Sequence, residues 1–121
     1  MKKRIFEWID NAVGLAIELE TELTKRPAVS PDSGGEGELD KCIFLETWLK
    51  AQGLTRLERY DAPDSRAKGG IRPNLIATIG GDGEQRLWII SHLDVVPPGE
   101  LSLWNSDPWT VLEVTEDQPF P

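Results

Sequence analysis

Four consecutive apolar residues, Leu87-Trp88-Ile89-Ile90, constrain the fold of this chain more than any other feature. The run is short and follows the turn-forming Gly80-Gly81-Asp82-Gly83, which is typical of a strand covered on both faces. Such a strand takes a central place in its sheet and needs a layer of structure on each side. The sequence therefore predicts an α/β fold.

The rest of the chain predicts two helices and several strands around this central one. Residues 5–23 carry apolar side chains at three- and four-residue spacing, and residues 39–49 do so again before Gly53, a suitable left-handed C-cap. Alternation at residues 54–60 predicts a strand exposed on one face, and residues 74–79 predict another. Residues 30–37, 61–73 and 95–108 are expected to be loops, residues 109–114 a further strand, and residues 116–121 a polar tail.

Composition excludes several classes of function. The chain has 121 residues, enough for one domain, and 21 acidic against 13 basic residues give it a net charge of −8. That balance opposes nucleic-acid binding. Its single cysteine, Cys42, cannot form an intrachain disulfide and is expected to be a small buried residue, which favours the cytoplasm. Acidic residues interrupt the N-terminal apolar positions, so we expect no targeting or membrane segment.

The chemistry is expected directly after the central strand, at His92 and Asp94. In open α/β sheets, ligand sites gather at the carboxyl ends of strands. If strand geometry continues to residue 94, the two side chains point to the same face. The carboxylate would then accept a proton from one imidazole nitrogen and leave the other nitrogen's lone pair for a metal. The pattern alone is short, because a lone His near a strand end is more often a structural residue and catalytic zinc needs about three protein ligands.

Longer segments resemble a known family. The run SHLDVVPPG at residues 91–99, with LW at 103–104 and SDPW at 106–109, resembles the first metal-binding motif of the dizinc amidohydrolases and exopeptidases. That family includes succinyl-diaminopimelate desuccinylase, acetylornithine deacetylase, carboxypeptidase G and the carnosinase-type dipeptidases. AVSPDSGGEG at 28–37 and GGIRPNLIA at 69–77 also resemble its N-terminal region, so the match covers nearly the whole chain in the expected order.

The resemblance implies a zinc-dependent hydrolase acting on an amide bond in an N-acyl amino acid or small peptide. It implies that His92 ligates one of two zinc ions, with cobalt or manganese as alternative metals, and that Asp94 is the catalytic residue that orients the His92 imidazole. The family's other ligands and general base belong to later motifs, and this chain has no Glu-Glu pair and no second His. We therefore expect residues 1–121 to be the N-terminal portion of a zinc-exopeptidase-like catalytic domain, a mixed sheet flanked by helices, without the lid or dimerisation domain. The resemblance allows the longer protein to be a homodimer.

Two questions stay open at this level. The 121-residue product is either part of such an enzyme, inactive by itself, or a non-catalytic product, which would be a binding or assembly module or a truncated fragment without a role of its own. The basic residues Arg66, Lys68 and Arg72 either meet a substrate carboxylate or form a solvated surface.

Overall fold

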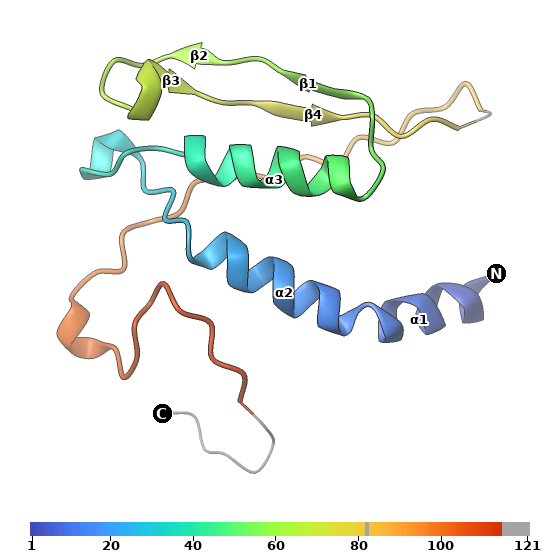
Figure 1. Ribbon diagram of the computed structural model, residues 1–121, viewed down its shortest axis with the longest axis horizontal. Helices are drawn as coiled ribbons and strands as arrows, with labels where there is room; N and C mark the ends of the chain where they lie inside the picture. The colour runs from blue at the N-terminus through green and yellow to red at the C-terminus, as the bar shows by residue number, and fades with distance from the viewer. Residues whose placement is uncertain (82, 115–121) are drawn as a thin grey trace. The chain divides into compact units, whose positions relative to one another are not determined.

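The computed structural model describes residues 1–81 and 83–114, so the expected tail at 116–121 and Asp82 of the expected turn lie outside the described residues. The chain divides into two units, Met1–Arg26 with Pro98–Pro121, and Pro27–Pro97. It combines α-helices with small antiparallel sheets (Figure 1), which confirms the mixture of helix and strand expected from the sequence. No helix within the described ranges has the length and apolar character needed to cross a membrane.

The first unit begins with two helices where the sequence predicts one. Helix α1 spans Lys2–Asn11 and helix α2 spans Val13–Thr24, with Ala12 between them at φ −93° and ψ 1°. Near the break the Asn11 side-chain amide donates to the Glu7 carbonyl oxygen at 2.7 Å, an i−4 contact that competes with the regular helix ladder. Asn11 and Gly14 are also weak helix formers, so the predicted helix is divided at this point.

The C-terminal part of the same unit holds a short 3-10 helix, η3, at Leu101–Leu103. The strand predicted at 109–114 is wrong for this structure, because residues 107–110 form a turn instead. The Asp107 carboxylate accepts from the Trp109 amide at 2.9 Å, and its carbonyl oxygen accepts from the Thr110 amide at 3.0 Å. An Asp side chain that bonds its neighbouring backbone favours such a turn over a strand.

The second unit contains helix α3, Leu39–Ala51, preceded by the 3-10 helix η1, Pro31–Ser33. The predicted helix at 39–49 and its end are confirmed. Gly53 adopts φ +87°, and the Leu54 amide donates to the Leu49 carbonyl oxygen at 3.1 Å. The helix thus ends at a left-handed backbone conformation, which glycine adopts at little cost.

A long antiparallel hairpin follows α3. Strand β1, Leu57–Arg59, pairs with β4, Leu75–Ala77, and strand β2, Ala62–Pro63, pairs with β3, Ile71–Arg72. The strands predicted at 54–60 and 74–79 are thus confirmed with shorter bounds. The loop predicted at 61–73 is wrong in part, since it contains β2, β3 and the 3-10 helix η2 at Lys68–Gly70.

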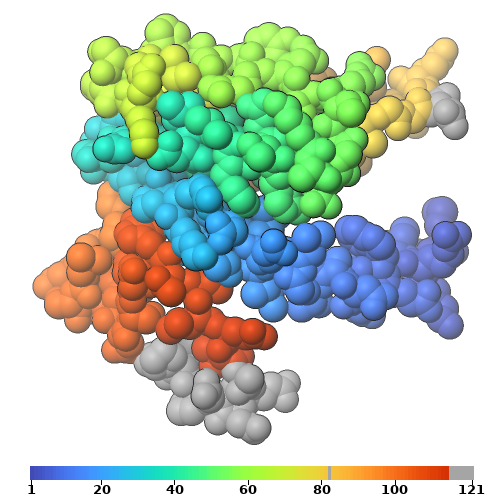
Figure 2. All heavy atoms as spheres, viewed as in Figure 1, coloured from blue at the N-terminus to red at the C-terminus, as the bar shows by residue number. Residues whose placement is uncertain are grey.

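The hairpin lies along α3, and the side chains of the two elements are in contact (Figure 2). Cys42 of α3 is fully buried, which confirms the expectation from sequence, and Ala28 and Ala67 are the other buried apolar side chains among the described residues. Burial raises the pKa of the Cys42 thiol. A buried thiol with a raised pKa is a packing residue and a poor nucleophile.

The central strand predicted at residues 87–90 is not formed, so this prediction is wrong for the described structure. Leu87, Trp88, Ile89 and Ile90 are 88%, 70%, 86% and 90% exposed. A strand needs a hydrogen-bonded neighbour and apolar cover, and in the part of the chain that the structure describes no segment pairs with this one. The expected mixed sheet with its central strand ending at His92 is therefore replaced by antiparallel pairs and one parallel bridge, between Val29 and Val95.

Candidate metal-ligating site

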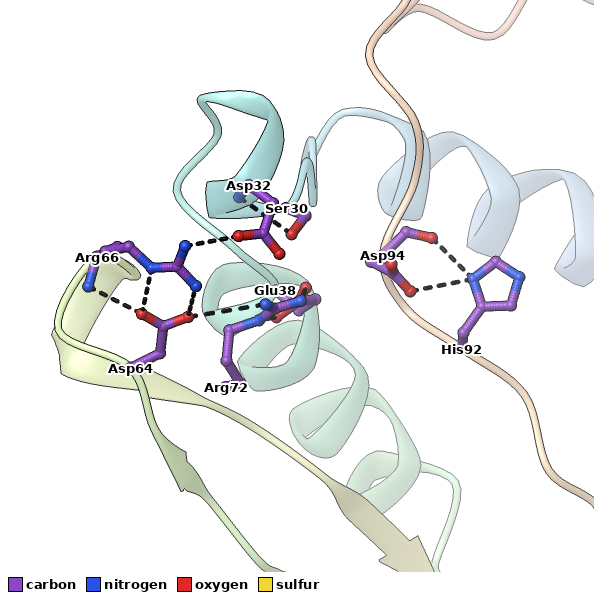
Figure 3. Close-up of polar contacts among 8 residues, drawn as sticks. All are labelled: Ser30, Asp32, Glu38, Asp64, Arg66, Arg72, His92 and Asp94. Carbon is purple, nitrogen blue, oxygen red and sulfur yellow. Dashed lines mark hydrogen bonds and ion pairs between the residues drawn. The ribbon is translucent and has the colours of Figure 1, made fainter.

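His92 and Asp94 contact each other on the extended segment that leads to Val95. The His92 Nδ1 atom lies 2.8 Å from the Asp94 backbone carbonyl oxygen and 3.2 Å from Asp94 Oδ1 (Figure 3). Both oxygens are acceptors, so the geometry favours a proton on Nδ1 and a lone pair on Nε2. Nε2 lies on the far side of the ring from Asp94, and the His92 side chain is 82% exposed. The His92–Asp94 pair, called the dyad below, therefore fixes one tautomer of the imidazole and leaves its Nε2 atom accessible.

The backbone next to this dyad is fixed to a distant segment. The Val95 amide donates to the Ala28 carbonyl oxygen at 3.1 Å, and Val29 and Val95 form the parallel bridge. This pairing holds Asp94 beside the beginning of the 28–37 segment. Two of the stretches on which the family resemblance rests thus meet in the second unit.

Glycines in the 28–37 segment allow its chain to fold back on Val29. A Cβ atom at Gly35 would stand 2.1 Å from the Val29 carbonyl oxygen, so no larger residue fits there without a shift. The Gly37 amide donates to that oxygen at 2.9 Å, and Gly37 has φ +84°. The Gly-rich sequence is therefore required by a close backbone approach.

The basic residues of the hairpin are bound in ion pairs. Arg66 donates through Nε and Nη2 to both Asp64 carboxylate oxygens at 3.0 and 2.9 Å and through Nη1 to Asp32 at 2.6 Å, and Lys68 contacts Asp40 at 2.5 Å. The Arg66 guanidinium lowers the pKa of Asp64, and hydrogen bonding to Asp40 raises the pKa of Lys68.

Arg72 completes this set by binding Glu38, with its Nε atom 2.6 Å from Glu38 Oε2. The cluster is thus neither a bare solvated surface nor an open carboxylate receptor. The sequence analysis missed these acidic partners. Their signal was the clustering of opposite charges, with acids at residues 32, 36, 38 and 40 and basic residues at 66, 68 and 72.

The described residues do not by themselves form a metal site. Among residues 1–81 and 83–114, no three His, Cys, Asp or Glu side chains gather closely enough to hold a metal ion. His92 supplies one donor of the type that zinc prefers, and Asp94 orients it. The assignment of His92 as a ligand stays a prediction.

Comparisons with known proteins find similarity to proteins named metallohydrolase and desuccinylase. It is 39% identical over 99 residues to an uncharacterized metallohydrolase of Methanococcus maripaludis, a match covering 77% of this chain and 23% of that protein. It is 36% identical over 101 residues to an uncharacterized metallohydrolase of Methanocaldococcus jannaschii, covering 78% of this chain and 24% of that protein. It is also 36% identical over 94 residues to the succinyl-diaminopimelate desuccinylase of Stenotrophomonas maltophilia, covering 78% and 21%.

The chain is a homologue of these metallohydrolases. The resemblance to succinyl-diaminopimelate desuccinylase recognised from the sequence is thereby confirmed. The chain spans between a fifth and a quarter of the length of these relatives. No family model matches the chain. No solved structure matches it either.

Proposed function

We propose that this homologue of the metallohydrolases contributes to a metal-dependent amidohydrolase, with residues 1–121 in the N-terminal part of a zinc-exopeptidase-like catalytic domain. One observation carries the proposal: His92 Nδ1 faces two oxygens of Asp94, which leaves Nε2 as a lone-pair donor within a motif that resembles a metal-binding one. The relatives named metallohydrolase and desuccinylase support the same class of reaction.

The residues present fit one position of such a metal site. Zinc accepts imidazole nitrogen, and a ligating His commonly donates its other ring N–H to a carboxylate or carbonyl oxygen. Both acceptors stand at His92 Nδ1. We propose two zinc ions in the whole protein, with cobalt or manganese as alternatives. We infer that the remaining ligands lie outside residues 1–81 and 83–114, because no three candidate side chains gather there.

The proposed substrate class is an N-acyl amino acid or a small peptide. Polarisation of the scissile carbonyl and activation of water near neutral pH are the chemistry that paired metal ions supply. In this scheme His92 binds one metal ion, and Asp94 fixes the tautomer and the direction of the His92 imidazole. Asp94 thus acts on the reaction through the orientation of His92.

A hybrid enzyme tests this proposal. The matched segment of the Stenotrophomonas desuccinylase is replaced by the corresponding residues of this chain, and release of succinate and bound metal are measured. We expect the hybrid to be active, His92→Ala to lose metal and activity, and Asp94→Ala to lose about 10–100-fold in affinity or activity. Lys50→Ala, an exposed position on α3, is the matched control and should behave as the unmodified hybrid.

Two results would contradict the proposal. A His92→Ala hybrid with undiminished activity would mean that the ligand lies elsewhere. An unmodified hybrid that folds and retains metal but releases no succinate would argue against a role of this chain in hydrolysis.

A further inference from the structure

Helix α1 carries an apolar face that the rest of the described structure leaves about half exposed or more. No residue of this helix is buried. Four large apolar side chains share one side of it, because their spacing is one, three and four residues: Ile5, Phe6, Trp8 and Ile9. Their exposed fractions are 51%, 62%, 68% and 48%. A contiguous apolar face of this kind is suited to binding a partner.

The charges of α1 are separated along the helix axis. Its first turn carries three cations, Lys2, Lys3 and Arg4, and its second half carries two acids, Glu7 and Asp10. This order is unfavourable within a single helix, because cations at the N-terminus and acids near the C-terminus oppose the helix dipole. The Lys3–Glu7 pair compensates weakly, since its atoms lie 3.9 Å apart on exposed side chains. The stability of α1 by itself therefore does not account for its charge pattern.

A second α1 helix in antiparallel orientation fits both features. The first turn of each helix then lies beside the second half of the other, so cations face acids at both ends and the two helix dipoles oppose each other. The two apolar faces meet between these ends. A two-fold contact uses the same face of both copies, so one set of residues serves both sides.

Other occupants fit the charge pattern less well. A parallel pair of α1 helices would place cations beside cations and acids beside acids. An anionic membrane surface would attract the first turn but repel Glu7 and Asp10. Charge complementarity thus favours a second copy of the same helix in the opposite direction.

We propose that the apolar face of α1 binds the α1 helix of a second copy of this chain, with the two helices antiparallel. A contact between two ten-residue helices buries little surface. We therefore expect weak pairing, with a dissociation constant on the order of 0.1–1 mM, which leaves α1 unpaired at micromolar concentrations. The proposal does not involve His92 or Asp94, so it stands or falls independently of the proposed function.

Paramagnetic relaxation between two copies tests the pairing and its direction. One copy carries a nitroxide at Asn11→Cys, together with Cys42→Ser, so that it has a single attachment site. The other copy is ¹⁵N-labelled without a nitroxide. Both carry Ile89→Glu, which replaces an exposed apolar side chain that could form a competing contact. At about 1 mM protein, antiparallel pairing should broaden the amide signals of residues 2–4 of the ¹⁵N-labelled copy most strongly.

Charge exchange within α1 supplies the matched variants. Lys3→Glu with Arg4→Glu makes the helix acidic, and Glu7→Lys with Asp10→Lys makes it basic. Each variant should pair with itself about tenfold more weakly or worse, because attractive contacts become repulsive. A mixture of the two variants should pair again. Both exchanges agree with the helix dipole, so the helix itself should not be lost.

The control is Lys25→Glu with Lys50→Glu, two exposed positions outside α1 that change the net charge as much as the acidic variant does. It should pair as the unmodified helix does. The proposal is overturned if no broadening appears at that concentration, if broadening is strongest around residue 11, or if the two charge-exchanged chains do not pair when mixed. Absent broadening together with binding to phosphatidylglycerol vesicles would assign the face to a membrane surface instead.

Discussion

The exposed run at residues 87–90 predicts that the 121-residue chain associates with itself. Its four apolar side chains stand in solvent on an extended backbone without a strand neighbour among the described residues. Unpaired, apolar extended segments are templates for pairing with another chain. We expect concentration-dependent association despite the net charge of −8.

Replacing Ile89 by Glu measures the strength of this association. Ile89 is 86% exposed, so nearly its whole side chain is available for burial. Full burial of an isoleucine contributes about 1.5–3 kcal/mol, and a symmetric contact between two copies loses it twice, roughly 3–6 kcal/mol. Because about 1.4 kcal/mol corresponds to a tenfold change, the variant should weaken self-association by roughly 100-fold to 10,000-fold.

Sedimentation velocity over a range of protein concentrations is the assay. The matched control is Leu103→Glu, which adds the same charge at an exposed leucine of the other unit. We expect Ile89→Glu to be monomeric where the unmodified chain and Leu103→Glu are associated. An unmodified chain that stays monomeric throughout, or a control that disperses equally well, would refute the reasoning.

The remaining predictions concern metal retention and stability. The isolated chain should neither keep zinc through dialysis nor hydrolyse N-acyl amino acids or dipeptides, because His92 and Asp94 leave most of a coordination shell to water; metal analysis and a turnover assay check both points. Gly35→Ala should lower the urea midpoint, since its Cβ would meet the Val29 carbonyl oxygen at 2.1 Å, whereas Gly14→Ala, in open space on α2, should raise stability by about 0.5–1 kcal/mol. Hydrogen bonding to Arg66 lowers the pKa of Asp64 in the folded protein. The stabilisation from this ion pair is therefore present above the unfolded-state pKa of about 3.9 and is lost on acidification. Asp64→Asn should make the urea midpoint depend less on pH between about pH 6 and pH 3.

Local patterns predicted the elements whose determinants are local. Helix α3 follows from apolar spacing and from Gly53, and β1 with β4 follow from alternation on either side of a turn-rich segment. The break at Ala12 coincides with a competing side-chain hydrogen bond at Asn11 and with the weak helix formers Asn11 and Gly14, which apolar periodicity does not register.

The elements that failed depend on partners distant in sequence. The strand at 87–90 was predicted from its apolar character, but a strand exists only where a neighbour accepts its hydrogen bonds. The Arg72–Glu38 pair joins residues 34 positions apart, and no local pattern indicates it. The contact of His92 with Asp94, in contrast, needs only a two-residue separation and an extended backbone.

The parallel bridge between Val29 and Val95 has a consequence for the order of folding. It joins residues about 66 positions apart, whereas the hairpin of β1 and β4 forms from nearby residues. Hairpins form within microseconds, while long-range contacts wait for the closure of a large loop. During synthesis, Val95 leaves the ribosome after the whole hairpin has been made. Asp94 thus reaches its place last, on a framework already folded, and changes that slow the hairpin should delay the dyad as well.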